Sequence, residues 1–235
     1  DLHSFPTRRS SDLEPGFEAA SGSALVEGYG LSETSPVATC NPVSGASKEG
    51  SIGVPLPGTR ISVRSLENPA KEVTLGENGE ICIAGPQVMK GYWQRPKETA
   101  DVMIGEFLRT GDVGFMDTEG YTFIVDRIKD MIIASGFNVY PRKIEEAIYE
   151  FQGVEEVTVV GIPDTYRGEA PKAFIKMRPG VTATKEDLLR FLEPKLSKIE
   201  MPAQIEFRDE LPKTLIGKLS KKELRAEMKA HDTKA

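Results

Sequence analysis

The 235-residue chain has few cysteines and no long apolar run, and each of these absences excludes some classes of protein. Cys40 and Cys82 are too few and too widely spaced for a disulfide framework or a zinc site, which predicts a reduced, cytoplasmic setting. The longest apolar stretches cover only a few residues, too short for a transmembrane helix. Because 36 acidic residues outnumber 30 basic ones, the net charge of −6 argues against nucleic-acid binding through overall charge.

Residues 1–13, DLHSFPTRRSSDL, show neither helical nor strand periodicity and lack the apolar core of a signal peptide. The string resembles a translated sequencing-library adaptor, so we interpret it as a non-native leader; a disordered Ser/Arg-rich leader is the alternative. On the first interpretation, Glu14 marks an arbitrary break in a longer gene.

The remaining sequence predicts a mixed α/β or α+β fold in two parts. In residues 14–126, a short strand at 24–27 precedes a Gly-rich loop, and alternating apolar runs from residue 50 predict a small antiparallel sheet or barrel rather than helices. Residues 131–235 mix β-rich runs with helical periodicity, which predicts a compact α+β domain. Helix starts are indicated by Pro141, by Thr184 and by Ser220 with Glu223.

Two strings contain candidate nucleotide-binding residues. In EGYGLSETSP, residues 27–36, the two glycines leave the ring of Tyr29 free to stack on a purine, and Ser32 and Glu33 suit a phosphate and its magnesium ion. In FLRTGDVG, residues 107–114, the carboxylate of Asp112 has the capacity to accept hydrogen bonds from both hydroxyls of a ribose. Taken singly, each string is also compatible with an ordinary glycine-containing turn.

Two further strings contain candidate cations. In VDRIKDMIIASGFNVYPRKIEE, residues 125–146, Arg127 offers a rigid fork for ribose or phosphate oxygens. In LPKTLIGKLSKKELR, residues 211–225, Lys218 follows a glycine that gives its loop flexibility, so its ammonium group could reach a polyphosphate. Seven basic and three acidic residues in 212–235 give this end a charge of +4, which favours a polyanion; a solvated linker and a basic tail are the alternatives.

Together with GEICIAGPQVMKGYWQRPKET, residues 79–99, these strings resemble the adenylate-forming (AMP-binding) superfamily of acyl-CoA synthetases, peptide-synthetase adenylation domains and beetle luciferases. The resemblance runs from residue 14 to 225, and the wording is most similar to bacterial long-chain fatty-acid–CoA ligases. It implies that 14–126 is the C-terminal portion of the AMP-binding N-terminal domain, with a sheet edge and a small β-barrel subdomain. It also implies that 127–130 is a hinge and that 131–235 is a mobile C-terminal domain.

The implied activity is that of an acid–thiol ligase, which joins a fatty acid to coenzyme A by way of an acyl-adenylate. Its co-substrates are ATP and coenzyme A, and its metal ion is Mg²⁺, held by Glu33. Lys218 would stabilise charge during adenylation, and Lys129 would stand at the hinge. The implied ATP- or AMP-binding residues are Tyr29, Gly30, Ser32, Asp112 and Arg127. The implied coenzyme A-binding residues are Ser135, Gly136 and Phe137.

The family's phosphate loop, of the kind S-S-G-T-T-G-x-P-K-G, occurs nowhere in the sequence. We therefore expect no ligase turnover from these 235 residues alone. Alternatives are an adenylating ligase for another acid or a carrier protein, and a non-catalytic nucleotide-binding module. A Rossmann dehydrogenase is excluded, because Gly28-Tyr29-Gly30 lacks the third glycine. Partners are expected to be small molecules, with peripheral association of the full enzyme at the inner membrane as a further possibility.

Overall fold

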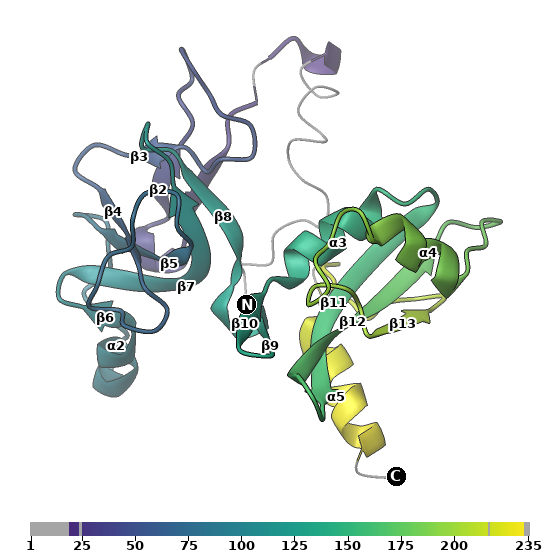
Figure 1. Cartoon of the computed structure of the whole chain (residues 1–235). Coiled ribbons are helices and arrows are strands. Elements are labelled where there is room, and N and C mark those ends of the chain that lie inside the picture. The colour runs from purple at the N-terminus through teal and green to yellow at the C-terminus, as the bar shows by residue number, and fades with distance from the viewer. Residues whose placement is uncertain (1–18, 24, 216, 233–235) are drawn as a thin grey trace. The chain divides into compact units, whose positions relative to one another are not determined.

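The chain forms two compact units, Asp1–Ile128 and Lys129–Ala235 (Figure 1). The computed structural model describes residues 19–23, 25–215 and 217–232, so the predicted leader at 1–13 lies outside the described residues. The division between the units falls inside the predicted 127–130 segment. Whether this segment acts as a hinge stays a prediction.

The first unit begins with a small antiparallel sheet in the order β1-β2-β3. Its strands are β1 (Gly28–Gly30), β2 (Val37–Cys40) and β3 (Val54–Pro55), and a 3₁₀ helix, η1 (Ser32–Thr34), follows β1. The strand predicted at 24–27 is wrong, because the strand that pairs with β2 is Gly28–Gly30; Glu27 precedes it, and the Glu27 carbonyl accepts from Asn41 N at 2.8 Å. Residue 24 lies outside the described part of the chain.

A five-stranded antiparallel sheet makes up most of the first unit and confirms the predicted barrel-like region. Register shifts in its ladders accompany a curl into a half-barrel. The order is β4-β5-β7-β6, with β8 also paired to β7. The strands are β4 (Arg60–Arg64), β5 (Gly79–Ala84), β6 (Met103–Ile104), β7 (Phe107–Met116) and β8 (Thr122–Arg127).

One helix in this region, α2 (Pro96–Val102), was not expected from the sequence. None of its residues is buried, so it has no apolar stripe that periodicity could reveal. The available signal was Pro96 at the first helical position, which suits proline because that N–H has no partner inside the helix.

The second unit is an α+β domain around a mostly antiparallel sheet in the order β10-β9-β12-β11, with β13 parallel to β12. It begins within η2 (Ile128–Asp130). Its strands are β9 (Ile132–Ala134), β10 (Phe137–Val139), β11 (Val154–Asp164), β12 (Gly168–Met177) and β13 (Gln204–Phe207). Its helices are α3 (Pro141–Tyr149), α4 (Lys185–Leu192) and α5 (Lys221–Asp232).

The three predicted helix starts in this unit are confirmed. Pro141 is the first residue of α3. The Thr184 hydroxyl accepts from Asp187 N at 3.1 Å, and the Ser220 hydroxyl accepts from Glu223 N at 3.4 Å. Each hydroxyl satisfies a backbone donor that the first turn of a helix leaves unpaired.

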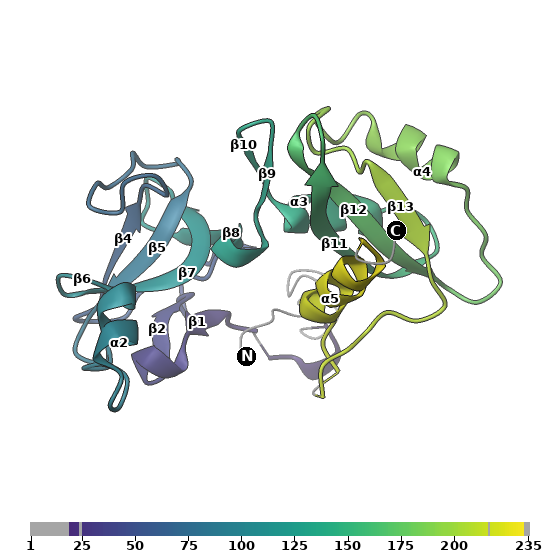
Figure 2. The ribbon, with the colours of Figure 1, turned by 90° about the horizontal axis from the view of Figure 1, so that it is seen from below.

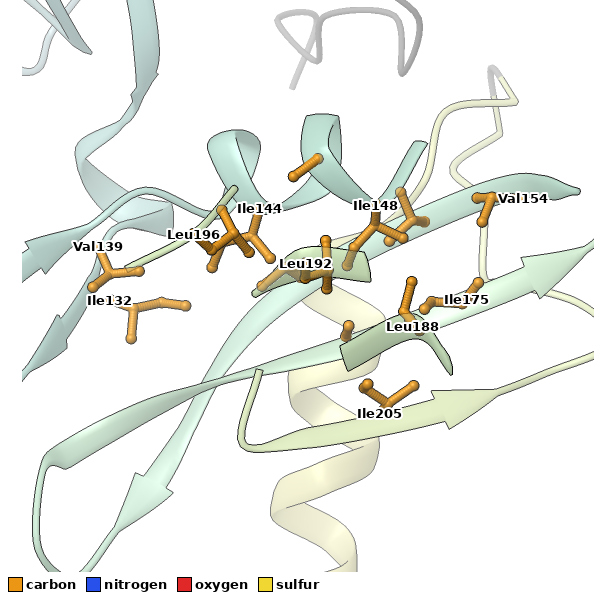
Figure 3. Packing of buried hydrophobic residues seen from close by; sticks show 14 of the residues in the cluster. Ile132, Val139, Ile144, Ile148, Val154, Ile175, Leu188, Leu192, Leu196 and Ile205 are labelled. Carbon is orange, nitrogen blue, oxygen red and sulfur yellow. The ribbon is translucent and has the colours of Figure 1, made fainter. Parts of the chain in front are cut away.

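Alternating strand residues bury both faces of this sheet. On one face, Val159 and Ile175 join a core under α3 and α4, which Figure 3 shows from close by. On the other face, Val160 and Phe174 pack with Leu224 of α5, the helix that Figure 2 shows against the sheet. Side chains one residue apart in a strand point to opposite faces, so α3 and α4 cover one core and α5 covers the other, and the described members of both clusters belong to the second unit.

We therefore expect the second unit to fold independently. Limited proteolysis of the whole chain should leave a resistant fragment that starts near residue 130. In that fragment, Ile148→Ala should lower the free energy of unfolding by about 2–5 kcal/mol, because the fully buried side chain leaves a cavity. Preferential digestion of residues 129–235, or a noncooperative urea transition of the isolated fragment, would contradict this expectation.

Candidate functional site

Three predicted nucleotide-binding residues meet in the first unit, although they come from β1, β7 and β8. Tyr29 donates its hydroxyl to Asp112 Oδ2 at 2.5 Å. The Nε atom of Arg127 lies 3.3 Å from Asp112 Oδ1, and the two residues are cross-strand partners in the β7–β8 ladder. Asp112 is only 2% exposed, so its charge is held in a desolvated position between these two partners.

The environment of Tyr29 keeps its hydroxyl protonated. Burial, and then the charge of Asp112, raise the pKa of Tyr29 well above its usual value of 10.0. At neutral pH the hydroxyl is therefore a donor to Asp112. Tyr29 as a whole is 5% exposed and belongs to the same buried apolar cluster as Ile81 and Ile83. Stacking of this ring on adenine stays a prediction, and it requires that a ring face be uncovered.

A buried carboxylate that sequence reasoning missed holds the turn before Asp112. Glu80, 2% exposed on β5, accepts from Arg109 Nε at 2.8 Å and from Gly111 N at 3.2 Å. The Thr110 hydroxyl accepts from Asp112 N at 3.1 Å. The signal in the sequence was one acidic residue inside the otherwise apolar strand β5, because a buried charge needs a partner.

The segment after β1 presents Ser32 and Glu33 on η1. The turn depends on Gly30, since a Cβ there would lie 1.6 Å from the carbonyl oxygen of Pro36. Ser32 is exposed, and Glu33 Oε1 accepts a hydrogen bond from the Tyr92 hydroxyl at 2.9 Å. Sequence reasoning did not single out Tyr92, which stands 59 residues from Glu33 in the chain.

A cavity of about 210 Å³ opens beside Glu33 and Tyr92. Its polar lining is Glu33, Glu80, Tyr92, Asp101, Arg109, Thr110 and Gly111. Gly111 connects this cavity to Asp112 through the chain, but Tyr29, Asp112 and Arg127 do not line it. In the first unit the structure therefore brings the predicted ribose-binding residues together and places the predicted metal ligand at a neighbouring cavity.

Ser135, Gly136 and Phe137 belong to the β9–β10 hairpin of the second unit. Ser135 and Gly136 have φ angles of +52° and +81°, which matches a two-residue hairpin turn with both central residues left-handed. Ser135 N donates to the Arg167 carbonyl at 2.7 Å, and Phe137 is 60% exposed. A Cβ at Gly136 would meet no described atom within 4 Å, so the φ angle alone favours glycine here.

Lys218 lies in a closed loop between β13 and α5. Thr214 N donates to the Lys218 carbonyl at 2.7 Å, and Lys218 N donates to the Thr214 hydroxyl at 3.2 Å. The neighbouring cations Lys213 and Arg225 pair with Glu156 and Asp130, respectively, which reduces the local positive field expected from composition. Within the described part of the chain, Lys218 forms no ion pair.

Lys129 begins the second unit, inside η2. The next residue, Asp130, accepts a salt bridge from Arg225 of α5 at 3.0 Å. This salt bridge connects the start of the second unit to its last helix. The boundary between the two units falls just before it in the chain, between Ile128 and Lys129.

Comparison with known proteins identifies both units. Residues 10–93 match the family model described as AMP-binding enzyme, and residues 143–218 match the AMP-binding enzyme C-terminal domain. A long-chain-fatty-acid–CoA ligase of Bacillus subtilis is 48% identical over 213 residues, covering 91% of this chain and 38% of the relative. A feruloyl-CoA synthase of an Amycolatopsis species is 42% identical over 206 residues, covering 87% and 41%.

Solved structures agree with this assignment. The crystal structure of ATP-bound MatB from Rhodopseudomonas palustris matches with a TM-score of 0.86 and 37% identity, covering 93% of this chain and 43% of that one. The chain thus spans well under half the length of the proteins it resembles. Both the family models and the fold show that the chain belongs to the AMP-binding enzyme family, with a match to the AMP-binding model followed by a match to the model of its C-terminal domain.

Proposed function

We propose that the complete gene product is an acid–thiol ligase that converts a long-chain fatty acid, ATP and coenzyme A to acyl-CoA, AMP and diphosphate. In the first step a carboxylate oxygen attacks the α-phosphorus of ATP, and diphosphate leaves. In the second step the coenzyme A sulfur attacks the acyl carbon, its proton is released, and AMP leaves. The buried Tyr29–Asp112–Arg127 cluster, in a chain 48% identical to a long-chain-fatty-acid–CoA ligase, carries the proposal.

In this proposal Asp112 accepts hydrogen bonds from the ribose hydroxyls. Each carboxylate oxygen has more than one acceptor site, so the hydrogen bond from Tyr29 to Oδ2 does not by itself exclude a ligand hydroxyl. Arg127 would support the same sugar. Its buried Nε atom lies 3.3 Å from Asp112 Oδ1 as an ion pair but makes no hydrogen bond to a described residue. An unsatisfied donor of this kind can bind a ligand oxygen.

Glu33 would hold a magnesium ion together with phosphate oxygens of ATP, and Ser32 would contact phosphate. Within the described residues there is no group of three His, Cys, Asp or Glu side chains that could hold a metal ion. A single carboxylate at a cavity nevertheless fits magnesium, which commonly takes one or two carboxylates and the phosphates of its substrate. When bound, the ion would supply neutralisation of the triphosphate charge.

The C-terminal domain would act as a mobile lobe that turns about Lys129. Lys218 would stabilise negative charge on the fatty carboxylate and the α-phosphate during adenylation, because its ammonium group has no partner among the described acids to compensate. Ser135, Gly136 and Phe137 would border the path of coenzyme A in the second step. The left-handed turn and the exposed Phe137 support this role, since a Cβ at Gly136 would meet no described atom within 4 Å.

The acid specificity can be tested by ATP–pyrophosphate exchange with the complete gene product, including any residues upstream of this chain. A panel of long-chain, medium-chain and aromatic acids should give the fastest exchange with a long-chain acid. Exchange led by an aromatic acid would favour the second candidate, which the 42% identity to a feruloyl-CoA synthase supports. Absence of exchange with every acid would favour a non-catalytic nucleotide-binding module.

No helix in the described residues is long and apolar enough to cross a bilayer. The cytoplasmic setting and peripheral association at the inner membrane stay predictions. The absence of turnover in the 235-residue chain also stays a prediction, which an assay of acyl-CoA formation with ATP and palmitate would test.

A further inference from the structure

The Tyr92 hydroxyl is a hydrogen-bond donor to the side chain of Glu33. It donates to Glu33 Oε1 at 2.9 Å, and both residues line the cavity of about 210 Å³. Among the described residues, Glu33 Oε2 makes no hydrogen bond. The protein therefore holds one carboxylate oxygen of a residue that lines the cavity, and no described residue makes a hydrogen bond to the other.

The loop that carries Tyr92 is attached to Glu33 at a second point. Met89 N donates to the Glu33 carbonyl at 2.8 Å, so backbone and side chain of Glu33 are both held by residues 89–92. The contact spans more than 50 residues of chain and joins η1 to the loop before α2. Two contacts of this kind restrict both the position and the rotation of one carboxylate.

The same loop is itself rigidly supported. Tyr92 N donates to the Thr99 hydroxyl at 2.9 Å, and that hydroxyl donates to the Arg95 carbonyl at 2.8 Å. Thr99 also fills the space beside Gly91, where a Cβ would lie 2.7 Å from its methyl carbon. The backbone of Tyr92 is therefore anchored at the start of α2 by contacts that do not involve Glu33.

From this geometry we propose that Tyr92 is a positioning residue for the metal-binding carboxylate of Glu33. The inference rests on the proposed function, in which Glu33 binds magnesium with ATP. Residues that donate hydrogen bonds to metal ligands orient those ligands. Removing such a donor commonly lowers metal affinity or activity by about 10- to 100-fold. The Tyr92 hydroxyl makes this contact with Oε1 of a residue that lines the cavity, and it would thereby hold the carboxylate in one orientation there.

The test compares Tyr92→Phe with the parent in the complete gene product. The Mg²⁺ concentration for half-maximal ATP–pyrophosphate exchange should rise by about tenfold, because phenylalanine keeps the ring and removes only the hydroxyl. A readout independent of turnover is Mn²⁺ binding in the presence of ATP and no acid, followed by electron paramagnetic resonance. Its apparent affinity should fall by a similar factor.

Tyr121→Phe is the matched control. It removes another tyrosine hydroxyl of the same unit, one that donates to the Ala46 carbonyl and not to a carboxylate. This variant should leave the Mg²⁺ and Mn²⁺ dependence at the parent value. If it shifts them as far as Tyr92→Phe does, the effect is general destabilisation and the inference is wrong.

Glu33→Gln separates failure of the inference from failure of the proposed function. If Glu33→Gln weakens Mn²⁺ binding and Tyr92→Phe does not, the positioning role is refuted and the metal role of Glu33 stands. If Glu33→Gln itself has no effect, both proposals are refuted. Support requires that Tyr92→Phe weaken binding in the parent but add less than about twofold in the Glu33→Gln background, as coupled residues do.

Discussion

Replacing Lys218 with alanine in the complete gene product is expected to slow acyl-adenylate formation by about 100-fold or more, the scale of losing one preorganised charge-stabilising group. The loop from Thr214 to Lys218 is closed by backbone and hydroxyl contacts, so the position of the residue survives truncation of its side chain. The ammonium group has no ion pair within the described residues, and its charge is therefore available to the reacting groups. ATP–pyrophosphate exchange with a saturating fatty acid measures the loss.

Lys213→Ala provides the matched control, because Lys213 stands at the other end of the same loop but pairs with Glu156 at 2.6 Å. Its loss should change the exchange rate by less than about twofold, since partly exposed ion pairs contribute little. A role in transition-state stabilisation also requires that the Lys218 variant lose kcat with little change in the KM for ATP. Equal losses in the two variants, or parent-like adenylation by Lys218→Ala, would refute the role.

Signals within single segments of the sequence were sufficient to predict much of the structure of the C-terminal domain. Pro141 and Thr184 mark helix starts through effects confined to one turn, and the helices they begin bury an apolar stripe that periodicity reveals. The alternation of Val159 and Val160 between two cores likewise follows from the geometry of a single strand. These elements could be predicted because the residues that determine each of them lie within the element itself or directly beside it.

The sequence was least informative where a distant partner decides the structure. The strand prediction at 24–27 was wrong because β1 begins at Gly28, where β2 pairs, and no property of residues 24–27 reveals this. The burial of Tyr29 and the hydrogen bond from its hydroxyl to Asp112, 83 residues away, were likewise not visible in the sequence, while the stacking of its ring on adenine stays a prediction. The Tyr92–Glu33 contact also joins separate strings, so composition and spacing could not predict it.

Replacing Asp112 with alanine is expected to lower the free energy of unfolding of the first unit by about 3–5 kcal/mol, because it removes one member of a buried pair. The change leaves the guanidinium of Arg127 without its counter-charge and the Tyr29 hydroxyl without its acceptor. Hydrogen exchange of the β7 and β8 amides in the 235-residue chain reports the stability of this unit separately from the C-terminal domain. In the complete gene product, the same variant should also raise the KM for ATP.

Further variants test whether the destabilisation by Asp112→Ala comes from the buried charge of Arg127 that it leaves unpaired. Tyr29→Phe removes one hydrogen bond to the carboxylate and keeps the ring, so it should cost less, about 1.5–3 kcal/mol. Glu106→Ala breaks the exposed ion pair with Arg60 and should have almost no effect on the free energy of unfolding.

Adding Arg127→Met to Asp112→Ala should recover part of the lost stability, since the unpaired charge of Arg127 is then absent while the aliphatic packing is kept. If Asp112→Ala destabilises the unit no more than Glu106→Ala does, the buried cluster does not hold β1, β7 and β8 together, and its proposed place in nucleotide binding loses its structural basis.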